Sequence, residues 1–348
     1  PMTISENASE TEPPAALRWP AEWEPHAATW LTWPQNPETW PGRLAEAQRE
    51  YAGFVAALAG REGIRLLVHD AAAEDGARHA LAAAGVDADR HVQFLQVRTD
   101  DSWIRDYGPI FVEGGAPRHF RFDAWGGKYP PWDDDARAAS RAAAQLGIEV
   151  EGVDFVLEGG SIEGNGDGCV LTTESCLLNP NRGLDRTREG VEARLAETLG
   201  TRQVVWLADG ITGDDTDGHI DDLARFVGPQ TIVAVEGDDP TDLDTPILAE
   251  NLRRLRAARD LAGRPFEVVT LPAPPPHVVS GQRCPASYAN FYLANGVALV
   301  PTFGTASDER ALAMLAELLP DREVIGVSCV TLVLGLGALH CLSQQEPG

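Results

Sequence analysis

The stretch GDDTDGHIDD (213–222) gathers five aspartates near one histidine, His219. Carboxylates this close repel one another, so the pattern indicates that a positive charge binds there. His219 and Asp221 form an H-x-D pair, and Asp215 and Asp217 add carboxylates just upstream. Such a set suits either a divalent metal ion or a cationic substrate.

The metal alternative fits this stretch poorly. A calcium loop fails, because Gly213 stands where the first acid belongs and Ala224 where the bidentate glutamate belongs. No second histidine follows at helical spacing. We therefore predict no metal here and favour a cationic substrate.

Cys341 is the candidate nucleophile among the cysteines. It ends a glycine-rich apolar run (330–339), predicted as a strand, and stands beside His340 with the polar residues SQQ close behind. A thiol at the end of a strand in a polar loop can reach a substrate as the reactive thiolate. The other cysteines lie in apolar or strand-like settings, and we interpret them as buried packing residues: Cys169, Cys176, Cys284 and Cys329.

Two further segments carry residue types that suit a cation. Trp103 and Asp106 lie three residues apart in SWIRDYGP, and a flat ring near a carboxylate can bind a planar cation. The alternative is that Trp103 belongs to the core and Asp106 pairs with Arg105. Glu158 precedes two glycines in EGGSI, where the alternative is a solvated turn.

The elements that must position these residues recur along the chain. Six helical patterns are each followed by an apolar strand pattern, and from residue 134 the helices begin about every 50–60 residues, which is typical of a repeated supersecondary unit. The unusual residues fall in the loops after the strands, so equivalent loops are expected to meet around one axis and form one composite site. We predict a flexible tail over residues 1–17 and a single catalytic domain over 18–348. The predicted helices cover 43–60, 72–84, 134–147, 184–200, 246–263 and 307–320.

Composition narrows the partners. The chain has 348 residues with 53 acidic and 28 basic side chains and a formal net charge of −25, so nucleic acid and anionic membranes are not expected partners. No segment reaches the ~18 apolar residues of a membrane span. Five cysteines without a CxxC pattern favour free thiols in the cytoplasm.

Longer motifs give the chain a family resemblance. It closely resembles agmatine deiminases, of the guanidine-modifying superfamily that also contains arginine deiminase and bacterial peptidylarginine deiminase. The resemblance runs from about residue 18 to 346 and implies a five-bladed, pseudo-symmetric α/β propeller, no cofactor and a homo-oligomer. Its motifs are PAEWEPHAATWLTWPQNPETWPG (20–42), DDSWIRDYGP (100–109), DAWGGKYPPW (123–132), EGGSI (158–162), TTESCLLNPNR (172–182), DTDGHIDD (215–222), PASYANFY (285–292) and LHCLSQQ (339–345).

The resemblance also implies roles for individual residues. Cys341 resembles the family nucleophile, His219 the general acid and base, and Glu158 the acid that orients it. Asp106 and Asp221 resemble the carboxylates that grip the guanidinium. The chain departs from the family pattern at Cys169, at Gly183, where asparagine is usual, and at Leu336, in a stretch that is usually all glycine.

The expected reaction is hydrolysis of agmatine to N-carbamoylputrescine and ammonia through a covalent cysteine thiouronium, a step toward putrescine and the polyamines. Asp215 and Asp217 are candidates for the distal amine, with turn capping as the alternative. Two other hypotheses stay open, namely a deiminase of another guanidine such as peptidylarginine, and a non-catalytic cation-binding protein.

Overall fold

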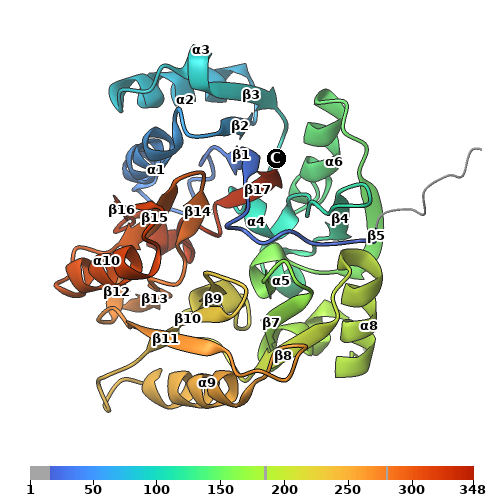
Figure 1. The fold of residues 1–348 in the computed structure, drawn as a ribbon. Coiled ribbons are helices and arrows are strands. Elements are labelled where there is room, and N and C mark those ends of the chain that lie inside the picture. Colours follow the sequence, from blue (N-terminus) through green and yellow to red (C-terminus); the bar gives the residue numbers. More distant parts are fainter. Residues whose placement is uncertain (1–15, 184–185, 280) are drawn as a thin grey trace, which may run out of the picture.

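The structure is a computed structural model that describes residues 16–183, 186–279 and 281–348. Five units recur among these residues, and in each a helix joins two parallel strands (Figure 1). The five units are β1 (His26–Thr32), α1 (Leu44–Leu58) and β2 (Gly63–Val68); β4 (Arg118–Arg121), α6 (Asp135–Gln145) and β5 (Glu151–Val156); β7 (Cys169–Thr173), α8 (Arg188–Leu199) and β8 (Gln203–Leu207); β10 (Thr231–Glu236), α9 (Thr245–Ala257) and β11 (Glu267–Pro272); and β15 (Val297–Thr302), α10 (Ser307–Leu318) and β16 (Glu323–Ser328).

A short antiparallel strand extends four of these pairs. In the second unit the isolated bridge between Ile110 and Arg118 takes that place. The first sheet also continues through α2 (Ala71–Ala83), α3 (Ala88–His91) and β3 (Val92–Gln96), which runs parallel to β2. The antiparallel strands are β17 (Ser343–Pro347) beside β1, β6 (Glu163–Gly164) beside β7, β9 (Ala224–Phe226) beside β10, and β14 (Tyr292–Ala294) beside β15.

Short helices and turns occupy the connections. They are α4 (Ile104–Tyr107), α5 (Ala124–Gly127), α7 (Glu174–Leu177), the 3₁₀ turns η1 (Gly159–Ser161), η2 (Pro180–Arg182), η3 (Ile220–Asp222) and η4 (Leu332–Gly335), and a hairpin of β12 (His277–Val279) and β13 (Gln282–Cys284).

The small sheets surround a common centre (Figure 1). The sheet of β1, β2 and β3 lies at the top of the view, β4 and β5 at the right, β10 and β11 at the bottom, and β14 to β16 at the left. The α/β class and the repeated unit predicted from the sequence are confirmed. The arrangement agrees with the five-bladed propeller that the family resemblance implies.

Local signals explain where the helices begin and end. The helix expected over 184–200 begins only at Arg188, because the Thr187 side chain accepts a hydrogen bond from the Gly190 N–H and caps it. Gly200, with a φ of 71°, ends the same helix in the left-handed conformation that glycine adopts without strain. The expected strand over 330–339 is wrong, since that segment forms η4 and a loop.

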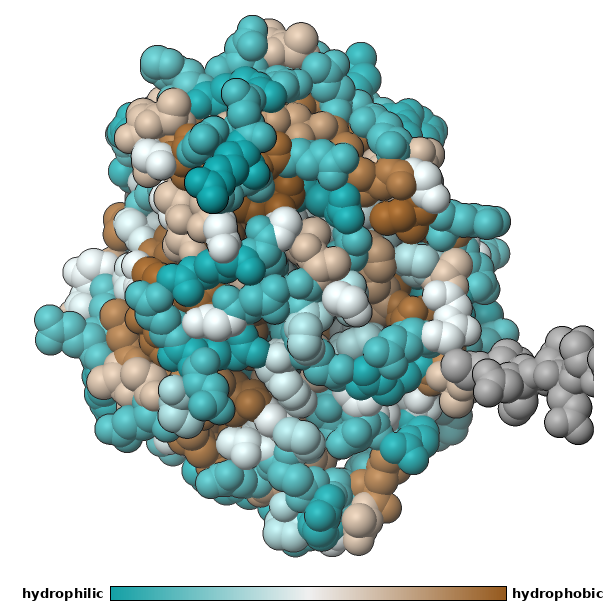
Figure 2. Space-filling model, turned by 45° about the horizontal axis from the view of Figure 1, so that its top comes forward, coloured by the Kyte–Doolittle hydropathy of each residue, from teal (hydrophilic) through white to brown (hydrophobic). Residues whose placement is uncertain are grey.

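Buried apolar side chains lie between each helix and the strands it covers. Helix α1, for example, buries Tyr51, Phe54, Val55 and Leu58 completely. Hydrophilic residues predominate on the face drawn in Figure 2. None of the helices in the described ranges combines the length and apolar composition needed to cross a bilayer. Residues 1–15 of the expected tail lie outside the described residues, and the single domain stays a prediction.

Candidate active site

The loops after the strands open onto one cavity of about 830 Å³, which lies in the usual range of small-molecule sites. Five of the predicted residues line it, namely Trp103, Asp106, Asp215, His219 and Cys341. They come from three different units, so the repeat places sequence-distant loops together as expected. Asp222, which was not predicted as a site residue, also lines this part of the cavity.

Cys341 lies in a loop and is only 7% exposed. The expectation that Cys341 ends a strand is therefore wrong, although Cys341 does line the cavity. The glycines before it let the chain pack against indole rings, since a side chain at Gly335 would begin 2.9 Å from both Trp40 and Trp103. Leu336 adopts a φ of 70° where the family usually has glycine. The loop still brings Cys341 to the cavity wall.

The Cys341 thiol is held by two side chains. Asn290 donates from Nδ2 to Sγ at 3.0 Å, and Sγ donates to Oδ2 of Asp221 at 3.5 Å. Asn290 Oδ1 also accepts from the backbone N–H of His340 and of Cys341. Burial raises the pKa of the thiol well above its usual value, and Asp221, Asp222 and Asp106 raise it further. The thiol is therefore protonated when no cation is bound.

Asp106 and Asp221 lie next to one another with different partners. Asp106 accepts from Trp125 Nε1 at 2.9 Å and from the Gly160 N–H at 2.9 Å. Burial raises the pKa of Asp106, and the negative charges of Asp221 and Glu158 add to it. Asp221 accepts from His340 Nδ1 at 2.7 Å through Oδ2, while its Oδ1 is buried and has no partner among the described residues.

Glycine is required at position 160 because three side chains converge there. An added Cβ would lie 2.6 Å from His219 Nδ1, 2.9 Å from Asp106 Oδ1 and 3.1 Å from Asp221 Oδ2. Any larger residue would push these groups apart. The second glycine of EGGSI is thus part of the site for a steric reason.

His219 is buried and its ring is neutral. Its Nδ1 lies 3.8 Å from Asp106 Oδ1, and its backbone N–H donates to Asp214 Oδ2 at 2.9 Å. Burial lowers the pKa of His219 to about 3, although Asp221 opposes the change. A neutral imidazole can accept a proton, as a general base must.

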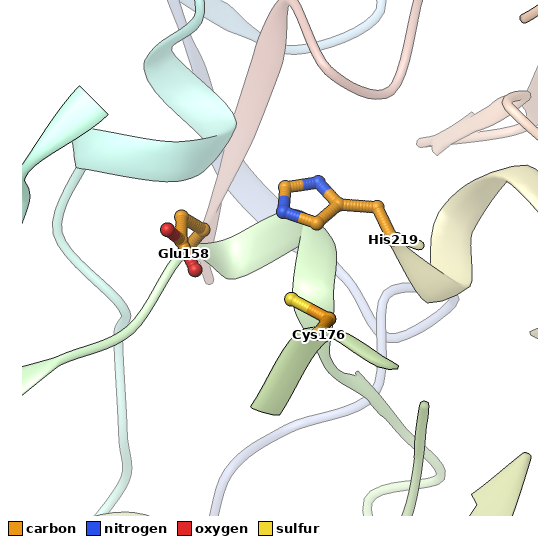
Figure 3. Close-up of side chains that lie close together, drawn as sticks. All are labelled: Glu158, Cys176 and His219. Carbon is orange, nitrogen blue, oxygen red and sulfur yellow. The ribbon is translucent and has the colours of Figure 1, made fainter. Parts of the chain in front are cut away.

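Glu158 lies close to His219 (Figure 3). Its Oε1 accepts from Arg182 Nε at 3.0 Å. Its Oε2 and the Nε2 of His219 are both buried and have no hydrogen-bond partner in the described part of the chain. Burial raises the pKa of Glu158, and Arg182 opposes this shift.

His340 lies behind Asp221, between two buried carboxylates. Its Nδ1 contacts Asp221 at 2.7 Å and its Nε2 contacts Glu22 at 2.8 Å. Burial disfavours charge on Glu22, but Arg225 and His340 outweigh it and hold the pKa of Glu22 well below its usual value. His340 likewise lowers the pKa of Asp221 against the effect of burial. Each ring nitrogen of His340 thus lies within hydrogen-bond distance of one carboxylate.

The remaining predicted residues separate into different settings. Trp103 packs against the loop that carries Cys341. A Cβ at Gly337 in this loop would lie 2.5 Å from the Trp103 ring and 3.1 Å from Cys341 Cβ. Asp215 accepts from the Tyr129 hydroxyl and lines the cavity. Asp217 is bound by Lys128 and Asn181 at 2.8 Å each and by Arg182, so its contacts are those of a structural anchor.

Sequence reasoning did not assign five residues that shape the site. Each lies in one of the motifs that carry the family resemblance, and that membership was the available signal. Their contacts were not predictable, because spacing along the chain does not show which segments meet. They are Glu22, Trp125, Arg182, Asn290 and His340.

The fold is shared beyond close relatives. An amidinotransferase of Microseira wollei has a TM-score of 0.51 at 12% identity, covering 94% of this chain and 96% of that one. At this low identity, the likeness concerns the fold alone. The family model described as Porphyromonas-type peptidyl-arginine deiminase matches residues 18–347, and the chain belongs to this family.

Close relatives are consistent with that assignment. The agmatine deiminase of Pseudomonas fluorescens is 36% identical, with 94% of this chain and 95% of the relative covered. That of Stutzerimonas stutzeri is also 36% identical, with the same coverage of 94% and 95%. The solved agmatine deiminase of Enterococcus faecalis has a TM-score of 0.89 at 31% identity, covering 95% of this chain and 96% of that chain.

Proposed function

We propose that the protein is an agmatine deiminase, which hydrolyses agmatine to N-carbamoylputrescine and ammonia. The observation that carries the proposal is the buried, unpartnered Oδ1 of Asp221, whose other oxygen contacts the Cys341 thiol. A buried carboxylate oxygen needs a donor, and a guanidinium bound beside the thiol supplies one. The named relatives support the same substrate.

Binding of the guanidinium follows from its shape and charge. It is planar, permanently charged and rich in N–H donors, so the carboxylates of Asp106 and Asp221 can fix its plane through charge-assisted hydrogen bonds. The Trp103 ring adds a flat surface in the same cavity. This clamp holds the central carbon near Cys341 Sγ and orients it for attack.

The reaction proceeds in two halves. In the first, His219 takes the thiol proton, Cys341 Sγ adds to the guanidinium carbon, and the tetrahedral adduct releases ammonia on a proton from His219. In the second, His219 takes a proton from water, hydroxide adds to the thiouronium carbon, and the C–S bond breaks to give the ureido product and the free thiol. Glu158 is the acid that orients His219.

The raised pKa of Cys341 makes substrate-assisted ionisation part of the proposal. The cation offsets the charges of Asp106, Asp221 and Asp222, so the pKa of the thiol falls when the substrate binds. The thiol is titrated by alkylation rate with and without a non-hydrolysable guanidine. An unchanged thiol pKa would rule this step out.

The acidic cavity favours agmatine over arginine. Glu38, Asp100 and Asp215 line it, whereas Lys128, which also lines it, already binds Asp217. A second ammonium group would be stabilised there, while the carboxylate of arginine would be repelled. Asp215 is the proposed partner of the distal amine, and Asp215→Asn should raise KM for agmatine by about twofold to fivefold, as for a partly exposed ion pair.

One assay separates this proposal from its alternatives. Pure protein is incubated with agmatine, arginine or a capped arginine peptide in excess chelator, and ammonia and ureido product are measured. Agmatine turnover that persists in chelator and disappears in Cys341→Ser supports the proposal. Preference for the peptide would identify another guanidine substrate, and absence of any turnover would leave a cation-binding protein.

Partners and location are proposed on composition. A net charge of −25 supports a small cation as the partner in place of nucleic acid or an anionic membrane. Five free cysteines support a cytoplasmic location. A homo-oligomer follows from the family resemblance alone and is checked by light scattering.

A further inference from the structure

Cys176, interpreted from the sequence as a packing residue, lies beside the proposed general base. Its Sγ, a ring nitrogen of His219 and a carboxylate oxygen of Glu158 are all within 4.8 Å of one another. Figure 3 shows the three side chains converging from separate segments, with Cys176 in α7, Glu158 just before η1 and His219 just before η3. All three are buried, so this is a compact internal cluster of nitrogen, oxygen and sulfur ligands.

Two atoms of the cluster lack the partners that buried polar atoms normally have. Glu158 Oε2 and His219 Nε2 make no hydrogen bond within the described chain, although their residues are 0% and 1% exposed. An unpartnered buried polar atom is unfavourable, so such atoms usually mark a bound group or a functional contact. When His219 carries its proton on Nδ1, near Asp106, its Nε2 offers a lone pair.

We propose that Glu158, Cys176 and His219 bind one thiophilic divalent ion, such as Zn²⁺, and that the ion inhibits the enzyme. Thiolate, imidazole and carboxylate are the three protein ligand types that zinc accepts, with water as the fourth ligand. The bound ion would occupy Nε2 and hold the ring proton on Nδ1, which lies beside Asp106, so Nδ1 could no longer accept a proton. The inhibition rests on the proposed function, whereas the binding of the ion does not.

Local charge favours such an ion. The thiolate of Cys176 and the carboxylate of Glu158 together match its two positive charges. Arg182, which contacts Glu158 at 3.0 Å, is itself paired with Asp217. His219 also lines the cavity, so an ion from solvent can reach its ring.

The ion must displace the thiol proton, which is released to solvent. The apparent affinity should therefore increase as the pH rises.

Direct binding is tested with Cd²⁺, whose thiolate complexes absorb in the ultraviolet. The test protein is Cys341→Ser, which removes the other nearby thiol and keeps Cys176. We expect one Cd²⁺ per chain with a thiolate absorption band, displaced by Zn²⁺ but not by Mg²⁺. Adding Cys176→Ala should abolish the band. Adding Cys169→Ala, at the other end of β7, should leave it unchanged.

Three outcomes would overturn the site, namely no band in Cys341→Ser, a band that survives Cys176→Ala, or Mg²⁺ binding equal to that of Zn²⁺. If Cys176→Ala does not fold, His219→Asn in the Cys341→Ser protein replaces it. Loss of that ligand should lower the Cd²⁺ affinity more than about tenfold. An unchanged affinity would equally refute the site.

Inhibition is measured with agmatine on the wild-type chain. Zn²⁺ should stop turnover and a chelator should restore it, while Cys176→Ala, compared with its own metal-free rate, should need more than about tenfold more Zn²⁺. Equal sensitivity of the two proteins would refute inhibition through Cys176. A Cd²⁺ band without any agmatine turnover would refute the proposed function and leave the ion site standing.

Discussion

Two layers of buried charge meet at Asp221, and they are balanced differently. The layer behind it, here called the paired cluster, alternates negative and positive groups. Arg225 contacts Glu22 and Glu163 at 2.9 Å each, and His340 contacts Glu22 at 2.8 Å. The paired cluster comprises Glu22, Arg105, Glu163, Arg225 and His340.

The layer in front of Asp221, here called the substrate-facing cluster, has acids without matching cations. It comprises Asp106, Asp222, His219 and Cys341. Burial raises the pKa of Asp222 well above its usual value, and Asp221 and Asp214 add to the shift. The difference indicates that the paired cluster stabilises the fold, whereas the substrate-facing cluster is completed only by a bound cation.

The largest expected effect is the loss of turnover on changing Cys341 to serine. Removing the proposed nucleophile, which acts together with its base in the proposed mechanism, should lower kcat by at least about 10⁴-fold. The rate of ammonia release from agmatine measures the loss, and binding of agmatine by calorimetry should persist because the carboxylates of Asp106 and Asp221 remain. Cys169→Ala serves as the control with full activity. A comparable kcat in Cys341→Ser would remove the thiol from the mechanism.

A change in the paired cluster should act on stability. Glu163→Gln leaves the buried Arg225 with one carboxylate fewer, and breaking a buried ion pair costs about 3–5 kcal/mol. Urea denaturation measures the free energy of unfolding. The control is Glu250→Gln, which disrupts ion pairs on exposed α9 and should change it by less than about 1 kcal/mol. Equal effects of the two changes would contradict the distinction between the layers.

A matching change in the substrate-facing cluster should lower activity and leave stability intact. Asp106→Asn removes a charge that burial disfavours, so the ligand-free protein should be at least as stable as the wild type. The guanidinium loses an ionic partner, however, and kcat/KM should fall by about 10²–10³-fold, the range for truncating a buried charge pair. Steady-state kinetics measure the loss in kcat/KM, and a melting curve measures the stability of the ligand-free protein. Reduced stability with normal kinetics would place Asp106 in the paired cluster.

The smallest expected effect is on the pH dependence of stability. Because the pKa values of Asp106 and Asp222 are raised in the folded protein, the folded state binds more protons than the unfolded state above the unfolded pKa. Their unfavourable contribution therefore grows as the pH rises from about 4 through the raised folded pKa. Bound agmatine offsets it, so the stabilisation of Cys341→Ser by agmatine should be larger at about pH 8 than at about pH 5. If melting curves showed the same stabilisation by agmatine at both pH values, the carboxylates of the substrate-facing cluster would not lack a cationic partner in the free protein.

Much of the fold could be predicted because its signals are local. Apolar runs after helical patterns correctly predicted strands such as β8 and β16, and their regular spacing predicted loops that meet. The apolar run before Cys341 was misread as a strand. Its glycines serve to pack the chain against Trp40 and Trp103, which lie far away in sequence.

The site could be predicted in its residue types but not in its contacts. Cys341, His219 and Asp106 stood out by composition and by motif. Asn290 and His340 did not, since their roles depend on contacts with Cys341, Glu22 and Asp221 that no spacing reveals. Asp215 and Asp217 looked alike in the sequence. Of these two described residues, Asp215 lines the cavity, whereas Asp217 pairs with Lys128.

The pairing of β17 with β1 has a consequence for heat inactivation. The β17–β1 ladder and the ion pair of Glu346 with Arg65 close the ring of sheets at this seam, and Cys341 lies only two residues before β17. Fraying of the seam would withdraw the sulfur from the cavity while the other four sheets keep their helices. Catalytic half-life on heating should then be shorter than the half-life of the helical circular dichroism signal, with amide exchange fastest along β17.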